Sequence, residues 1–115
     1  MKTNYKELYL LYSADLYNGY TKEDVKRHNA AMKKLGKLFY MLEAEQDRSF
    51  LLELLQNERE HTRTLVAAHC LGLGVYVSEA KKVLSDLAKN KDDLVVAYGA
   101  KNILEVWEKE GYLKF

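Results

Sequence analysis

The sequence predicts an all-α fold, a short stack of about six helices arranged as three antiparallel pairs. Apolar residues recur with the 3.6-residue period of a helix along almost all of the 115 residues, and no proline interrupts this pattern. A weak internal repeat runs through the chain as well. A length of 115 residues fits one domain, so we expect residues 1–115 to form a single helical-repeat domain.

The expected helices follow from the apolar spacing and from capping residues. The first covers residues 3–17 and ends before Gly19, because glycine tolerates the left-handed conformation of a helix end. Thr21 caps the second helix, whose first turn holds Glu23 and Asp24 beside the positive end of the helix dipole. The others are expected over residues 49–56, from Glu60 or Thr62 to about Leu73, over residues 78–89, and from a cap at Asp92 or Asp93 to about Gly111.

The internal repeat becomes visible when the second, fourth and sixth helices are written beneath one another. They share an alanine and, four residues later, a leucine, in the pairs Ala31/Leu35, Ala67/Leu71 and Ala100/Leu104. Residues four apart lie on one face of a helix, so each helix pair has an apolar face that stacking would bury. The odd-numbered helices align similarly, and the apolar face of the first is expected to hold Leu8, Leu11 and Tyr12.

This pattern resembles the HEAT-like α-solenoid repeats, above all over residues 62–110, where AAHCLG is followed by EAKKVL and a further helix. The C-terminal half also resembles a small bacterial HEAT-like family known as a domain of unknown function. Small stand-alone domains of this kind look like immunity proteins of bacterial contact-dependent toxin systems. The resemblance implies a protein-binding inhibitor that neutralises a toxin domain by tight binding, with a nuclease as the favoured class of toxin.

The sequence contains no recognisable catalytic centre, so we expect no enzyme activity, no cofactor and no metal. Cys70 is the only cysteine and is expected to be buried and inert within its helix. His61 and His69 are separated by about 12 Å along one helix, too far to share a zinc ion. His28 lies three residues before the first repeated alanine, so we expect it to face the core.

The turns that lead into the even-numbered helices are expected to lie on one edge of the stack. Each turn carries two carboxylates, in the pairs Glu23/Asp24, Glu58/Glu60 and Asp92/Asp93. Two interpretations remain open, because acidic residues commonly cap helix N-termini and could equally form a partner-binding edge. Tyr17 and Tyr20 adjoin the first pair and could anchor a partner, since tyrosine is enriched at interfaces.

Two further groups of side chains stand out in the first 40 residues. Tyr5, Tyr9 and Tyr12 form a stripe that is expected to cover the open end of the stack. The second helix carries a basic face that could contact phosphates, made of Lys26, Arg27, Lys33, Lys34 and Lys37. Because the later even-numbered helices carry only Arg63 and Lys101 there, we interpret it as a solvated face.

The expected partner is therefore a protein, with this chain a monomer in a heterocomplex. A net charge of +1 provides no long-range attraction for nucleic acid or acidic lipid. The chain shows neither a signal peptide nor an apolar run long enough to span a bilayer, so we expect a cytoplasmic location and no membrane contact. The alternatives are a nucleic-acid-binding HEAT-like domain and an adaptor or accessory subunit.

Overall fold

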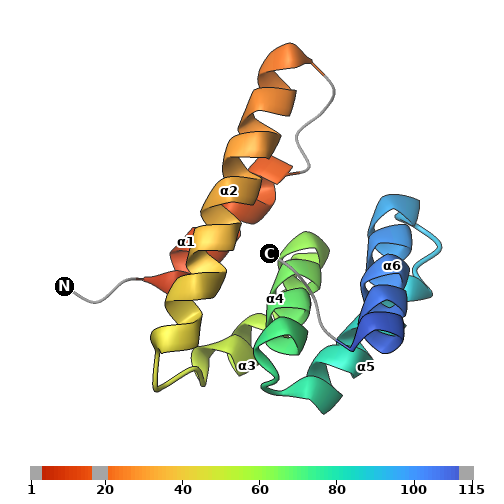
Figure 1. Ribbon diagram of the computed structural model, residues 1–115. Helices are drawn as coiled ribbons and strands as arrows, with labels where there is room; N and C mark the ends of the chain where they lie inside the picture. The colour runs from red at the N-terminus through yellow and green to blue at the C-terminus, as the bar shows by residue number, and fades with distance from the viewer. Residues whose placement is uncertain (1–3, 17–20, 112–115) are drawn as a thin grey trace. The chain divides into compact units, whose positions relative to one another are not determined.

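The computed structural model describes residues 4–16 and 21–111, and over these residues it is all-helical, with six helices and no strand (Figure 1). This confirms the predicted fold class at the level of secondary structure. The chain divides into two compact units, residues 1–50 and 51–114. The helices are α1 (Tyr5–Leu16), α2 (Lys22–Ala44), α3 (Phe50–Leu54), α4 (Glu60–Leu73), α5 (Val77–Ala88) and α6 (Leu94–Glu110).

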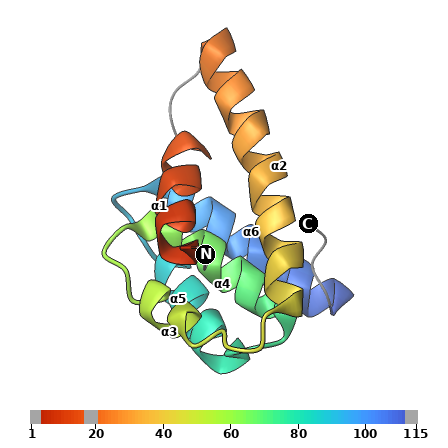
Figure 2. The ribbon, with the colours of Figure 1, turned by 90° about the vertical axis from the view of Figure 1, so that its left-hand side faces the viewer.

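In the first unit, α1 and α2 pack side by side (Figures 1 and 2). The core between them is apolar and includes Tyr9, Leu38 and Leu42. The ring of Tyr5 is buried and stacks on Phe50, with 5.1 Å between ring centroids. Tyr5 and Tyr9 are therefore core residues, whereas the sequence predicted that they would cover an open end.

α2 begins with a complete capping box. The Thr21 hydroxyl accepts a hydrogen bond from the Asp24 N–H, and the Asp24 carboxylate accepts one from the Thr21 N–H, both at 3.1 Å. α2 has 23 residues and α1 only 12. Because α1 is too short to cover the first turns of α2, these turns are solvent-exposed.

The sequence predicted that His28 and Leu11 would face the core, and both predictions are wrong. His28 lies on turns of α2 that α1 does not cover, and Leu11 lies on the outer side of α1. His28 is exposed, and its Nδ1 lies 3.0 Å from the carbonyl oxygen of Leu16, the last residue of α1. It meets the end of α1 rather than the side-chain core. Leu11 is exposed because it lies about 140° around α1 from Leu16, on the face opposite the core.

In the second unit, α4 packs against both α5 and α6, and α5 packs against α6 (Figure 1). The repeated alanines Ala67 and Ala100 are fully buried, and so is Leu84 of α5. α4 ends at Gly74, which adopts the left-handed conformation with φ 72° and donates its N–H to the carbonyl oxygens of Cys70 and Leu71. These helices begin and end close to the positions that the sequence predicts.

α3 is shorter than the expected 49–56 segment. At its start, the Asp47 carboxylate accepts hydrogen bonds from the N–H and the hydroxyl of Ser49, which hold Ser49 in a turn outside the helix. At its end, Gln56 donates to the carbonyl oxygen of Glu53, and this three-residue step closes the last turn. Local hydrogen bonds at both ends therefore limit α3 to five residues.

Candidate functional site

Two of the three predicted acidic turns meet in the second unit, at the start of α4 and at the α5–α6 turn. The Asn90 amide donates to the Glu60 carboxylate at 2.9 Å and so joins the two turns. The amide oxygen of Asn90 also accepts the N–H groups of Asp92 and Asp93, at 2.8 and 3.1 Å. Asn90, which sequence reasoning did not single out, is therefore the residue that connects this acidic edge.

Asp93 has a structural role at this edge. Its carboxylate accepts the N–H groups of Val95 and Val96, each at 3.1 Å, and thereby caps α6. Its second oxygen lies 3.9 Å from the His61 imidazole. Burial lowers the pKa of His61, and the nearby carboxylates of Asp93 and Glu60 oppose that shift. Asp93 is thus the N-cap residue of α6.

Glu58 and Asp92 are the exposed carboxylates of this edge. Neither side chain has a hydrogen bond or an ion pair to any described residue. Exposed basic side chains alternate with them along the same two turns, namely Arg59, Lys89 and Lys91. The positive and negative charges of this edge therefore nearly cancel. Its only exposed carboxylates without a partner among the described residues are those of Glu58 and Asp92.

The remaining acidic turn belongs to the first unit. Glu23 is exposed, whereas Asp24 is engaged by Thr21 and by the guanidinium of Arg27. The hydrogen bonds from Thr21, reinforced by Arg27, hold the pKa of Asp24 below its usual value. Asp24 therefore completes the capping box of α2, whereas Asp93 is itself the N-cap residue of α6. Tyr17 and Tyr20, the predicted anchors beside this turn, lie outside the described residues.

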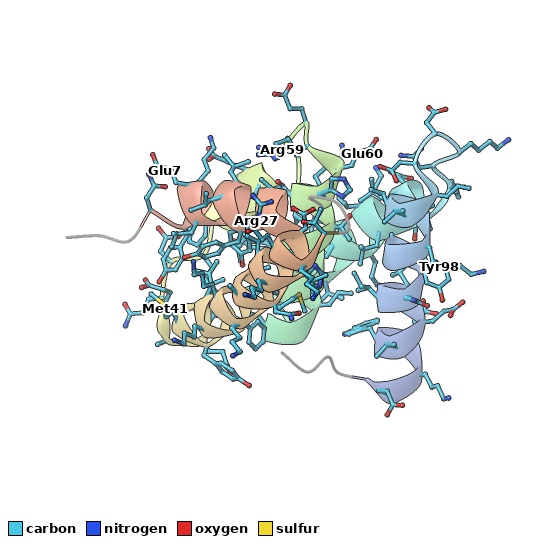
Figure 3. The ribbon with its side chains drawn as sticks, turned by 90° about the horizontal axis from the view of Figure 1, so that it is seen from above. Glu7, Arg27, Met41, Arg59, Glu60 and Tyr98 are labelled. Carbon is cyan, nitrogen blue, oxygen red and sulfur yellow. The ribbon has the colours of Figure 1, made fainter. Side chains whose placement is uncertain are left out.

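An exposed apolar surface follows directly after the Asp93 cap. Leu94, Val95 and Tyr98 of α6 are 74%, 59% and 69% exposed, and we refer to these three residues as the α6 face. Figure 3 shows Tyr98 projecting from α6 on the side away from α4 and α5. Three large apolar side chains exposed within two helical turns form a contiguous patch of the kind that marks binding surfaces.

Sequence reasoning missed the α6 face, although the repeat contained the signal. The expected core positions of the sixth helix are Ala100, which is fully buried, and Leu104, which is half-buried. Leu94 and Tyr98 are offset from Ala100 by six and two positions, which places them about 120° and 160° from it around the helix. The repeat register alone would therefore have placed these apolar side chains in solvent.

The candidate reactive groups of α4 are held in the interior. Burial raises the pKa of the Cys70 thiol to about 12, with Glu79 adding to the shift, so the nucleophilic thiolate is disfavoured. Burial also lowers the pKa of His69 to about 3, which keeps its imidazole neutral. Within residues 4–16 and 21–111, no three side chains of His, Cys, Asp or Glu are grouped so as to hold a metal ion.

Comparisons with known proteins indicate no function for this chain. No family model matches the sequence, and no curated protein or solved structure matches it significantly. None of the helices in the described part of the chain combines the length and the apolar character needed to cross a bilayer. The features that bear on function are therefore the α6 face, the exposed carboxylates of Glu58 and Asp92, and the basic side chains of α2.

Proposed function

We propose that this chain is a protein-binding module that inhibits one partner by covering its functional surface. The observation that carries the proposal is the α6 face, with Leu94, Val95 and Tyr98 exposed side by side. Exposed apolar patches with polar surroundings are typical of protein-binding surfaces, and buried tyrosines contribute strongly to interface stability. In function, such a module corresponds to an immunity protein that neutralises a bacterial toxin domain in the cytoplasm.

The proposed partner presents an apolar patch with basic side chains at its margin. Glu58 and Asp92 support this choice, since both are exposed and neither is used for capping. A nuclease toxin fits this description, because nuclease active sites bind phosphates and are therefore basic. The apolar face supplies most of the binding free energy in this proposal, and the two carboxylates contribute specificity and association rate.

In this proposal the module inhibits its partner by binding to the partner's functional surface, and it catalyses no reaction. Two properties of α4 support this view, the buried thiol of Cys70 and the buried neutral imidazole of His69. The finer fold belongs to the same proposal: a single domain of three antiparallel helix pairs in a HEAT-like stack. The complete burial of Ala67 and Ala100 and the near-complete burial of Ala31 support this arrangement.

Affinity capture with matched variants tests the proposed function. The chain is immobilised as the parent protein, as Leu94→Ser/Tyr98→Ser, and as Val25→Ser/Met32→Ser, a control that removes an equally apolar exposed pair from α2. We expect one bacterial protein to be retained by the parent and the control and lost by the α6 variant. The purified partner should be a toxin domain whose activity stops at an equimolar amount of the parent chain.

Two results of the capture would contradict this proposal. One is a partner that the α6 variant retains as well as the parent does, which would place the interface elsewhere. The other is a captured protein whose activity is unchanged by saturating amounts of the chain, which would exclude inhibition. The adjacent reading frame gives an independent check, because a toxin system predicts a large secreted protein with a variable C-terminal domain.

A further inference from the structure

The exposed side of α6 carries a row of side chains that continues from the α6 face toward the end of the helix. Five exposed residues make up this row, namely Val95, Tyr98, Asn102, Val106 and Lys109. They lie within about 80° of one another around the helix, and Asn102 in the middle is about 160° from the buried Ala100. We refer to these five residues as the α6 row, whose tyrosine projects into solvent in Figure 3.

The spacing of the α6 row is the same when it is followed from either end. Its members are separated by three, four, four and three residues, so the pattern is symmetric about Asn102. A second α6 that runs antiparallel, with the twofold axis at Asn102, would therefore meet this row with an identical row. Tyr98 would then lie level with Val106 of the second copy, and each contact would occur twice, as in any isologous interface.

The other members of the α6 row fit the same arrangement. Val95 would lie level with Lys109 of the second copy, whose aliphatic stem can cover an apolar side chain. Asn102 would meet Asn102 of the second copy at the axis, and an amide can both donate and accept a hydrogen bond. A central asparagine of this kind fixes the register of paired helices.

Two side chains of opposite charge lie beside the α6 row. Lys101 and Glu105 are both exposed and lie on the same side of the row, about 100° and 60° around the helix from Asn102. Neither forms an ion pair with a described residue. A lysine four residues before a glutamate is also the less favourable order for an ion pair within one helix. Both charges are therefore available to a second chain.

The antiparallel arrangement pairs these charges. The side of α6 that carries Lys101 and Glu105 would meet the same side of the second copy. Along the helix axis, Lys101 of one copy would be only about 3 Å from Glu105 of the other, so long side chains can join across the contact. Symmetry gives two such ion pairs. A parallel pair would instead bring each charge level with its own like charge, which is unfavourable.

We infer that a second copy of this chain covers the α6 row in the free protein, so that two chains form a symmetric antiparallel dimer. The symmetric spacing about Asn102 and the self-complementary charges of Lys101 and Glu105 favour a second copy over an unrelated chain. The inference concerns the chain alone and does not depend on the function proposed above. Because Tyr98 serves in both contacts, the dimer would have to separate before an inhibited partner binds.

The contact is small, so the dimer should be weak. α6 has 17 residues and is therefore about 25 Å long. Stable interfaces bury about 800 Å² on each partner, which is more than one pair of helices of this length provides, so we expect a Kd on the order of 10–100 μM. A dimer of this strength separates on dilution and leaves the α6 face available at low concentration.

Sedimentation equilibrium of the full chain between 5 and 500 μM at 50 mM salt tests the inference. We expect the apparent mass to rise from 13.4 kDa toward twice that value and no further, because an isologous contact closes at two chains. Tyr98→Ser should raise the Kd of the dimer about tenfold. Met32→Ser, which replaces an exposed apolar side chain of α2, should leave the Kd within about twofold of the parent.

Charge exchange tests which residues meet. Lys101→Glu and Glu105→Lys should each raise the Kd about tenfold, because each turns two attractive pairs into two repulsive ones. An equimolar mixture of these two variants should form heterodimers, and the double variant Lys101→Glu/Glu105→Lys should recover the parent Kd. Lys82→Glu and Asp86→Lys produce the same net charges at exposed sites of the same spacing on α5 and should have no effect.

Cysteine cross-linking tests the antiparallel direction. Asn102→Cys should give a disulfide-linked dimer under mild oxidation, because the two introduced thiols meet at the axis. Lys109→Cys should not, since the two copies of this position would be about 21 Å apart along the axis. Equal cross-linking of both variants would indicate a parallel pair and overturn the inference.

Two sedimentation results would overturn it as well. One is a parent chain that keeps a mass of 13.4 kDa up to 500 μM, a result that leaves partner capture by the α6 face unaffected. The other is a double variant Lys101→Glu/Glu105→Lys that dimerises no better than the single variants, which would show that these two residues do not meet.

Discussion

Histidine 69 gives the clearest pH dependence at the level of single residues. Its pKa is lowered from 6.5 to about 3 by burial, so the folded state holds a neutral imidazole where the unfolded chain holds a protonated one. The stability that follows from this is fully present above pH 6.5 and is lost as the pH falls from 6.5 toward 3. The expected slope is about 1.4 kcal/mol per pH unit.

Urea unfolding between pH 5 and 7 measures this slope. His69→Gln should reduce the number of protons taken up on unfolding by about one, and the slope should fall accordingly. The smaller pH dependence that remains is due to His61, because burial lowers its pKa as well. Asn29→Gln, a change at an exposed position of α2 that does not titrate, serves as the control and should keep the parent slope. A parent protein equally stable at pH 5 and pH 7 would show that His69 is not buried in the folded state.

The repeated alanines provide the second prediction at this scale. Ala67→Glu and Ala100→Glu each place a carboxylate at a fully buried position, which costs several kcal/mol without a partner. We expect both variants to lose the cooperative thermal transition followed by circular dichroism. Ala30→Glu, at an exposed position of α2, should melt within a few degrees of the parent. Parent-like melting of both buried-site variants would refute the repeat register.

Single positions were predictable where the repeat register and the helix contacts agree. Ala67 and Ala100 occupy equivalent positions of the repeat in α4 and α6, and Cys70 lies beside that position in α4; all three are buried, as the sequence predicts. His28 could not be placed in this way, because its exposure depends on the unequal lengths of α1 and α2. A column in an alignment of helices carries no information about how far the neighbouring helix extends.

At the scale of elements, replacing glycine by alanine should change the stability in opposite directions at two positions, one at a helix end and one inside a helix. Gly74 ends α4 with φ 72°, so Gly74→Ala should cost about 1 kcal/mol of stability through backbone strain alone. Gly99 lies inside α6, so Gly99→Ala should stabilise by about 0.5–1 kcal/mol. An added methyl group meets no atom within 4 Å at either site, so sterics do not obscure the comparison.

Thermal melting separates the two glycine variants. The change in midpoint should be about 4 °C for each kcal/mol, downward for Gly74→Ala and upward for Gly99→Ala. If Gly74→Ala melts at or above the parent temperature, α4 does not end in the left-handed conformation. If Gly99→Ala melts below the parent, the helix at that position is closely covered by another part of the protein.

Helix boundaries were predictable where a capping residue fixes them. Thr21, Asp93 and Gly74 each satisfy backbone groups at a helix end, and the helices begin or end there as the sequence indicates. α3 differs because Asp47 and Ser49 hydrogen-bond to each other in a turn that competes with the helix. Such competition depends on local geometry that periodicity does not record.

At the scale of the whole molecule, the sequence predicted which carboxylates lie in the turns before the helices, but not which of them are exposed. The structure brings Glu60 and Asp93 together through Asn90, yet assigns both to local hydrogen bonds. The α6 face was not predicted, because charge patterns in the turns carry no information about which apolar residues of a helix remain exposed. Of the six predicted carboxylates, Glu23, Glu58 and Asp92 are exposed and make no hydrogen bond or ion pair with a described residue, and the α6 face is exposed as well.

Charge reversal at the two free carboxylates tests their role in partner binding. Glu58→Lys/Asp92→Lys should weaken binding of the captured partner about tenfold at low salt, mainly through a slower association rate. Glu60 is left unchanged, because its carboxylate holds Asn90 and its reversal would disturb the fold. Glu79→Lys/Asp86→Lys, an equal charge change at exposed sites on α5, should stay within twofold of the parent.

Stopped-flow association at 50 and 500 mM salt measures this effect. The difference between the parent and the Glu58/Asp92 variant should shrink at high salt, because surface charges are screened over about 4 Å at 500 mM salt. Equal association rates of the two proteins at low salt would show that the acidic edge serves only in capping and turn formation.

The central claim is that the α6 face is the contact for an inhibited partner, and calorimetric titration of that partner tests it most directly. The partner is titrated with the parent chain, with Leu94→Ser/Tyr98→Ser and with Val25→Ser/Met32→Ser. All four substituted side chains are at exposed positions, so folding should be unaffected. We predict at least a tenfold higher Kd for the α6 variant and a parent-like Kd for the control. An α6 variant that binds the partner with the parent's affinity would contradict the account.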